Sequence, residues 1–196
     1  MAGLEKRICS VLVVSVSENF NNALSALLPV SRYDPIRYVS GISAAKRTLS
    51  ERDFDLVIVN SPLYEDIGTE FAIDAGSNSR TTVMFIAGAD VLEGLREKFI
   101  AAGVFPLPKP LTTQTFSLAL DWSVCVRERL RKLETKAISI EEKMTEIRLV
   151  NRAKWLLITE LKMEEPQAHH FIEKQAMDRC ITRREIAEEI IRTYSS

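Results

Sequence analysis

Short runs of apolar residues recur along the first half of the chain. The run at residues 8–14 is continuous and rich in β-branched side chains, which is typical of a strand buried on both faces of a sheet. Two further strong runs lie at residues 55–60 and 82–87, and weaker ones lie at 36–39 and 103–107. The pattern therefore predicts five strands.

Segments with a helical spacing of apolar residues separate these runs, at residues 20–28, 43–49 and 92–102. Strands that alternate with helices favour an α/β fold with an open, doubly wound, five-stranded parallel sheet. We assign residues 1–115 to this domain. Functional groups in such sheets lie at the carboxyl ends of the strands, so these ends are where its chemistry is expected.

A different pattern begins after Pro110, since neither Gly nor Pro occurs again until Pro166. Apolar residues here recur at spacings that alternate between four and three, which is the heptad seam of a coiled coil. We predict a long coiled-coil helix over residues 116–150. Its seam consists of Val126, Leu130, Leu133, Ala137, Ile140, Met144 and Ile147.

The charges beside this seam favour a parallel homodimer. With the first seam residue at heptad position d, Arg129 and Lys136 occupy g, while Glu134 and Glu141 occupy e. Residues at g and e′ meet across a parallel dimer, so both pairs are of opposite charge. Asn151 takes the next a position, where a buried Asn can fix the register. The alternative is a long amphipathic helix packed on its own domain.

The last segment, residues 151–196, predicts a small bundle of three helices. The first continues the long helix through Leu161, and Pro166 falls in the first turn of the second. The third opens at a capping-box pattern, with Thr182 followed three residues later by Glu185.

Composition adds limits rather than a function. Hydrophobic residues make up 46% of the 196 residues and charged residues 27%, which is ordinary for a globular protein. The net charge of -1 does not indicate nucleic-acid binding, so any contact with nucleic acid would depend on locally clustered basic residues. Cys9, Cys125 and Cys180 have no metal-ligand spacing and are expected to be small buried hydrophobes in a reduced compartment. Because neither a signal peptide nor a membrane helix is recognisable, we expect a cytoplasmic protein that does not contact the membrane.

The order of elements in residues 1–115, with Lys109-Pro110 after the fifth strand and Gly68 after the third, resembles a response-regulator receiver domain of flavodoxin-like fold. The resemblance implies an acidic pair after the first strand that holds Mg²⁺ and an acceptor Asp after the third. It also implies a Thr or Ser after the fourth strand.

This chain departs from the receiver pattern at each of those positions. Ser15 follows the first strand, with Glu18 the nearest carboxylate, Asn60 stands at the acceptor position, and Ala87 replaces the hydroxyl residue. An amide is not a useful phosphoryl acceptor, and Mg²⁺ lacks hard anionic ligands here. We predict a pseudo-receiver with a degenerate phosphoacceptor pocket formed by Ser15, Asn60, Ala87 and Lys109.

Other groups near this edge do not restore the chemistry. Lys109 is expected to donate to Asn60 or to nearby carbonyls. Glu65 and Asp66 are expected to lie in a solvated loop rather than to serve as substitute acceptors. Control would then come from a regulatory protein or ligand at the pseudo-receiver, or from dimerisation alone.

The C-terminal sequence resembles the ANTAR family, the RNA-binding domain of AmiR- and NasR-type antiterminators. The matching segments are residues 151–158, 165–168, 173–179 and 182–188, in the order and spacing of the family. One departure is Trp155, where the family usually has Gly. It would either stack on a base or lie in the bundle core, and the core is favoured. The resemblance implies that a dimer binds paired stem-loops in a leader transcript.

Six basic residues are candidates for RNA contact, and three of them gather around the turn into the third helix. There, backbone N–H groups add positive potential. The alternative is that each pairs with a carboxylate, namely Glu173, Asp178, Glu185 or Glu188. His169-His170 is expected at the surface. The candidates are Arg152, Lys154, Lys174, Arg179, Arg183 and Arg184.

Two functions from different classes follow. The first is an RNA-binding antiterminator, which makes and breaks no bond and so needs no catalytic residue, cofactor or metal. The second is a protein-interaction or dimerisation module of a signalling pathway. A phosphorylated, DNA-binding response regulator is disfavoured by Asn60 and by the lack of a helix-turn-helix pattern.

Overall fold

The computed structural model describes residues 8–64, 66–78 and 80–194. The chain divides into two compact units, Met1–Lys132 and Leu133–Ser196. The helix α5 (Thr113–Leu161) contributes its first turns to one unit and its last turns to the other. Each unit has its own apolar core.

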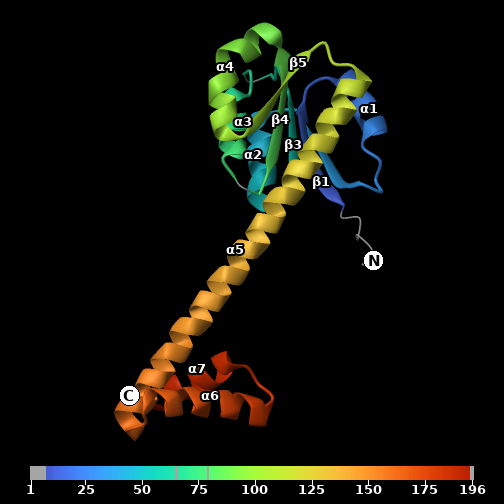
Figure 1. Ribbon diagram of the computed structural model, residues 1–196. Helices are drawn as coiled ribbons and strands as arrows, with labels where there is room; N and C mark the ends of the chain where they lie inside the picture. The colour runs from blue at the N-terminus through green and yellow to red at the C-terminus, as the bar shows by residue number, and fades with distance from the viewer. Residues whose placement is uncertain (1–7, 65, 79, 195–196) are drawn as a thin grey trace. The chain divides into compact units, whose positions relative to one another are not determined.

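The first unit is built on a five-stranded parallel sheet with the strand order β2-β1-β3-β4-β5 (Figure 1). The prediction of a doubly wound α/β fold is therefore confirmed. The strands are β1 (Cys9–Ser15), β2 (Tyr33–Val39), β3 (Leu56–Asn60), β4 (Thr82–Gly88) and β5 (Val104–Lys109).

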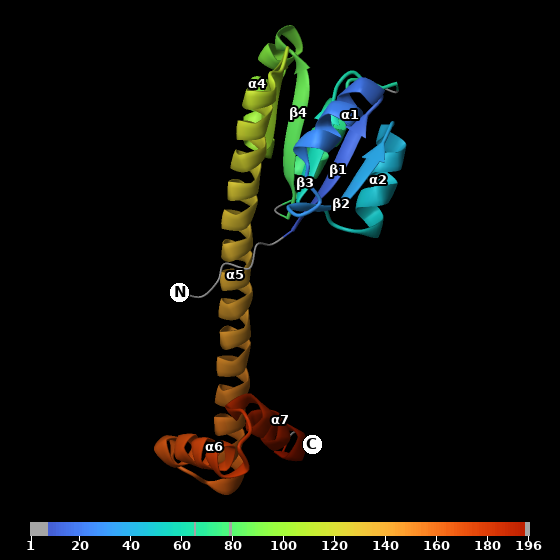
Figure 2. The ribbon, with the colours of Figure 1, turned by 90° about the vertical axis from the view of Figure 1, so that its right-hand side faces the viewer.

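Helices cover both faces of the sheet (Figures 1 and 2). α1 (Glu18–Leu27) and the start of α5 pack on one face. The other face is covered by α2 (Ile42–Glu51), α3 (Thr69–Gly76) and α4 (Ala89–Ala102).

Alternation along β1 explains why its apolar run is continuous. Leu12 and Val14 belong to the core beneath α2–α4, whereas Val11 and Val13 belong to the core beneath α1 and α5. All four are fully buried, because successive side chains of a strand point to opposite faces.

The helix α3 is not among the elements expected from the sequence. The helix is short and buries Phe71, Ala72 and Ala75 against the sheet. It begins after Gly68, whose φ of 85° lies in the left-handed region that favours glycine.

The predicted coiled coil begins within the α/β unit. Phe116, Ala119 and Leu120 on the first turns of α5 belong to the core of the sheet. Ser123 and Arg127, one and two turns further on, are also buried. The start of the helix therefore packs on the α/β unit, and this packing extends past Val126, the first seam residue.

The seam lies at the surface of this single chain. Its residues are exposed apart from Leu130, which is half-buried. The apolar stripe therefore does not pack on the chain's own described residues, contrary to the alternative of an amphipathic helix covered by its own domain. The exposed seam residues are Val126, Leu133, Ala137, Ile140, Met144 and Ile147.

The second unit is a bundle of the end of α5 with α6 (Glu165–Arg179) and α7 (Arg183–Tyr194). The Thr182 backbone N–H donates to Glu185 Oε2 at 2.8 Å, and the Glu185 N–H donates to Thr182 Oγ1 at 3.2 Å, so the predicted capping box is confirmed. The buried core consists of Ala153, Leu156, Leu157, Ala168, Ile172, Ala176, Ile186, Ala187 and Ile190.

Two expectations about burial were wrong. Cys9 is buried as expected, but Cys125 and Cys180 are exposed. Trp155 is 63% exposed, so its interpretation as a core residue fails, because the core side of α5 at this level is filled by Leu156 and Leu157.

Among the described helices, none is both long and apolar enough to cross a membrane. Within the same residues, no cluster of three or more His, Cys, Asp or Glu side chains is arranged to hold a metal ion.

Candidate functional site

At the carboxyl edge of the sheet, Ser15 and Asn60 lie side by side. They are register partners at the ends of β1 and β3, and Asn60 Nδ2 donates to Ser15 Oγ at 3.0 Å. Ser15 Oγ also accepts from the Ser17 backbone N–H at 3.2 Å. Both Ser15 and Asn60 are buried, so the predicted pair is brought together.

Lys109, at the end of β5, reaches the same edge. Its ammonium donates to the backbone carbonyl of Ser61, the residue after Asn60. Lys109 was expected to donate either to Asn60 or to a nearby carbonyl, and the structure shows the carbonyl. Burial lowers the pKa of Lys109. Ala87 is buried beside it, in register with Pro108 of β5.

The described carboxylates near this edge, Glu18 and Asp66, do not join Ser15, Asn60 and Lys109. Glu18 is exposed in the first turn of α1. Asp66 accepts from the Gly68 backbone N–H at the start of α3, and Glu65 lies outside the described residues. The edge therefore presents an amide, a hydroxyl and an ammonium group, and Asn60 Oδ1 is buried without a hydrogen-bond partner among the described atoms.

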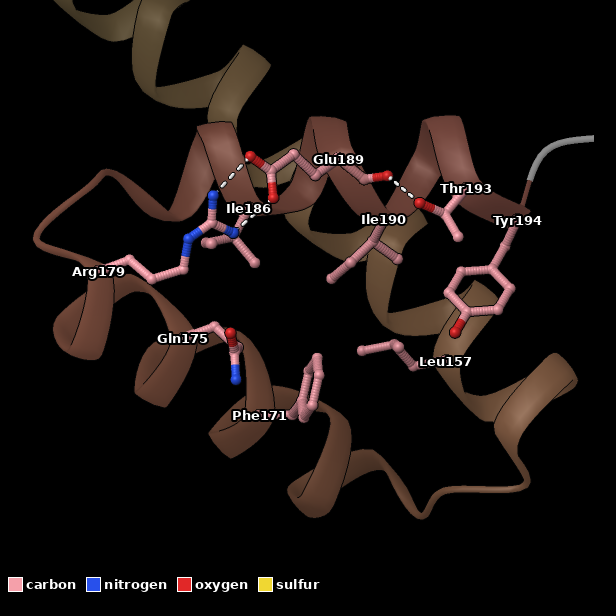
Figure 3. A pocket seen from close by; sticks show the side chains of 9 residues that line it. All are labelled: Leu157, Phe171, Gln175, Arg179, Ile186, Glu189, Ile190, Thr193 and Tyr194. Atoms are coloured by element: carbon pink, nitrogen blue, oxygen red, sulfur yellow. Dashed lines mark hydrogen bonds and ion pairs between the residues drawn. The ribbon is translucent and has the colours of Figure 1, made fainter.

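In the second unit, Arg179 is engaged by Glu189 rather than free. Its two terminal nitrogens donate to the two carboxylate oxygens of Glu189 at 2.5 and 2.9 Å (Figure 3). This hydrogen bonding lowers the pKa of Glu189 and raises that of Arg179. A bidentate pair of this kind fixes both side chains.

The Arg179–Glu189 pair closes one end of a pocket of about 200 Å³, with Tyr194 at the other end (Figure 3). The pocket floor is apolar and comes from all three helices. Its lining consists of Leu157, Phe171, Gln175, Arg179, Ile186, Glu189, Ile190, Thr193 and Tyr194.

The remaining arginines around the turn also have carboxylate partners. Arg184 Nε donates to Glu188 at 2.9 Å. Arg183 lies 3.5 Å from a carboxylate oxygen of Glu146 and 3.6 Å from one of Glu173. Arg183 and Arg184 are adjacent in sequence but lie near different carboxylates.

Lys154 forms an ion pair with Glu165, with Nζ and Oε1 separated by 2.7 Å. The pair joins α5 to the first turn of α6 and lowers the pKa of Glu165 through the hydrogen bond.

Four of the six basic candidates are therefore ion-paired. Glu146, Glu165 and Glu189 were missed as partners because each lies on another helix from its cation, beyond any local spacing rule.

Arg152 and Lys174 differ from the other candidates, because neither forms an ion pair with any residue that the structure describes. Both are exposed. The two His side chains are at the surface, as expected, and His169 Nε2 lies 3.3 Å from Glu173.

Both units are similar to known proteins. Residues 139–191 match the family model of the ANTAR domain, beginning on α5 upstream of Asn151. The receiver fold is found in the signal receiver domain of an HD domain-containing protein from Pseudomonas fluorescens Pf-5, with a TM-score of 0.56 and 25% identity. The match covers 69% of this chain and 97% of that one. The chemotaxis response regulator CheY4 of Vibrio cholerae shares the fold, with a TM-score of 0.52 and 20% identity, over 60% of this chain and 99% of that one.

The chain therefore combines a unit of receiver fold with a following segment, residues 139–191, that matches the ANTAR domain. It is similar to the transcriptional regulatory protein PdtaR of Mycobacterium tuberculosis, strains CDC 1551 / Oshkosh and ATCC 25618 / H37Rv. Identity is 28% over 145 residues, which cover 72% of this chain and 69% of either relative.

Proposed function

We propose that this protein is an RNA-binding regulator that controls transcription by antitermination in the cytoplasm. It would recognise stem-loops in leader transcripts and prevent a terminator from forming. The match of residues 139–191 to the ANTAR domain carries this proposal. The similarity to PdtaR, which is named a transcriptional regulatory protein, supports it. Such a regulator breaks no covalent bond, so it requires no catalytic residue.

Dimerisation through α5 is part of the proposal. The exposed seam places apolar side chains on one stripe of the helix, among them Leu133, Ile140 and Ile147. Burying such a stripe against a second copy is favourable at about 25 cal/mol per Å² of apolar surface removed from water. A parallel pair would present two ANTAR domains to two hairpins.

Phosphorylation is not the proposed switch. Asn60 occupies the end of β3, and its amide donates to Ser15 Oγ. Lys109 is engaged with the Ser61 carbonyl. An amide offers no oxygen anion for attack on a phosphoryl group, so a ligand or protein at the receiver unit is the proposed source of control.

The experiment is selection of RNA by the full chain from a library of transcripts that carry two hairpins with randomised loops. We expect enrichment of particular loops, and binding that weakens steeply with salt because phosphate contacts release counterions. The variant Ile172→Asp places a charge in the core of the ANTAR unit. It should disrupt that unit and bind no RNA, so it serves as the negative control. No enrichment by folded, dimeric wild type would contradict the proposal.

A second candidate is a protein-interaction module. One observation favours it: Lys154, Arg179, Arg183 and Arg184 all have carboxylate partners, which reduces the positive charge offered to RNA. The same selection separates the two functions, since an interaction module would enrich no RNA.

A further inference from the structure

The favourable charge pattern of the α5 seam ends in the middle of the helix. In a parallel dimer, Arg129 would face Glu134 of the second copy and Lys136 would face Glu141, as g and e′ positions do. The next such pair in sequence is Lys143 with Arg148. These two are both positive, so dimerisation would bring like charges together at the start of the ANTAR unit.

No carboxylate lies where it would neutralise Arg148 along the helix. The neighbours of Arg148 at spacings of three and four are Met144, Thr145, Asn151 and Arg152, and side chains at those spacings are the ones that meet on a helix surface. Within the described part of the chain, Arg148 and Arg152 form no ion pair.

The nearby acids point to another face of α5. Glu146 is within 3.5 Å of Arg183 on α7, and the charges of Glu142 and Glu146 act on Arg184, also on α7. They therefore lie on the side of α5 that faces the bundle. The face that carries Arg148 and Arg152 is left with positive charge.

Trp155 lies on the same face, because the steps from Arg148 to Arg152 and then to Trp155 are four and three residues. The indole is 63% exposed, and no described aromatic ring or guanidinium group stacks on it. A large exposed aromatic side chain beside arginines is a combination with which proteins bind unpaired bases and their phosphates.

We propose that this face of α5, formed by Arg148, Arg152 and Trp155 and joined in the dimer by Lys143 of the second copy, is the main RNA-contact surface and binds the single-stranded loop of a hairpin. Trp155 stacks on an unpaired base, and the two arginines contact the flanking phosphates. RNA phosphate also relieves the repulsion between Lys143 and Arg148 of the two copies. The inference rests on the proposed RNA binding and parallel dimer, and it moves the contact away from the ion-paired arginines at the turn into α7.

The first test uses the full chain and an RNA hairpin selected by the wild type. We expect Trp155→Ala to weaken binding by about tenfold or more, Trp155→Phe to restore most of it, and Trp155→Leu to restore little. The salt dependence of binding is expected to stay unchanged in these variants. In Arg152→Ala the slope of log K against log[salt] should fall by roughly 0.7, whereas Arg96→Ala, an exposed arginine of the receiver unit, should change neither affinity nor slope.

Fluorescence reports the stacking directly. The chain has two tryptophans, so Trp122→Phe leaves Trp155 as the only one. Titration with the hairpin should quench its emission. An RNA that binds this variant without changing the emission would overturn the stacking assignment.

Charge reversal at Arg148 gives opposite expectations for two properties. Arg148→Glu would turn the repulsive pair with Lys143 into an attractive one, so the free dimer should dissociate severalfold less readily. RNA binding should nevertheless weaken. Loss of both dimerisation and RNA binding would mean a structural role and would overturn the proposal.

The outcomes separate this inference from the proposed function. If the wild type binds no RNA, both fall. If the wild type binds RNA and the Arg148, Arg152 and Trp155 variants bind it equally well, RNA binding stands and this contact surface is wrong; the face would then be free for a protein partner.

Discussion

Arg127 Nε on α5 lies 3.0 Å from Asp55 Oδ1 at the entry to β3, and both side chains are largely buried, with 9% and 13% of their surface exposed. Arg131, one helical turn further on, donates to the same carboxylate oxygen. The backbone N–H and hydroxyl of Ser10 donate to Asp55 Oδ2. Asp55 therefore fixes the rotation of α5 on the sheet, and this leaves Val126 on the outer side.

Removal of the Asp55 carboxylate should destabilise the α/β unit. In Asp55→Ala, the buried guanidinium of Arg127 loses this partner, which costs about 3 kcal/mol for a buried pair. Urea unfolding of the unit measures this cost. Asp53→Ala is the matched control, because its pair with Arg80 is exposed and such pairs contribute about 1 kcal/mol or less. Equal losses in the two variants would contradict the role of Asp55.

The same carboxylate predicts a pH dependence. Burial opposes ionisation of Asp55, but the Ser10 N–H, the charge of Arg131 and further hydrogen bonds together lower its pKa below the ordinary value of 3.8. Because the pKa of Asp55 is lowered in the folded state, its stabilisation is complete above the ordinary pKa and is lost as the pH falls through the lowered pKa. Unfolding free energies measured from pH 6 to pH 3 should decrease less steeply at the acid end in Asp55→Asn than in the wild type.

The seam predicts a variant that separates dimerisation from folding. Ile140→Asp places a charge at seam position d, and because Ile140 is 59% exposed in the single chain, the variant should fold yet sediment as a monomer at concentrations where the wild type is dimeric. Ile138 is 56% exposed but lies off the seam, so Ile138→Asp should remain dimeric. A dimeric Ile140→Asp protein would place the interface elsewhere.

The sheet edge predicts that the protein takes no phosphoryl group. Incubation with radiolabelled acetyl phosphate and Mg²⁺ should leave it unlabelled, because Asn60 has no nucleophilic carboxylate and the residue beside it is Ser15. A phosphorylatable receiver treated in parallel shows that the reagent is active. Stable label on this chain would refute the interpretation as a pseudo-receiver.

Much of the fold could be predicted from the sequence, since its signals are local. A run such as Val11–Val14 is apolar on both faces and so specifies a central strand, and the Thr182 to Glu185 spacing specifies a helix start. The helix α3 escaped prediction because it is short and its burial of Phe71 depends on the sheet beneath it.

The candidate sites divide in the same way. The identities of Ser15, Asn60 and Lys109 followed from their places after strands, and the sheet then set Asn60 against Ser15. By contrast, no spacing rule could indicate that Arg179 pairs with Glu189 on the next helix.

The sequence by itself determined the five strands, the helices other than α3, the heptad seam and the ANTAR resemblance, because each depends on residues a few positions apart. Only the tertiary structure decided that Trp155 is exposed and that Arg183 faces Glu146. The physical reason is that the exposure of a side chain and the partner of a charge depend on which helices pack beside it. That packing is set by the whole apolar core, and not by neighbours in sequence.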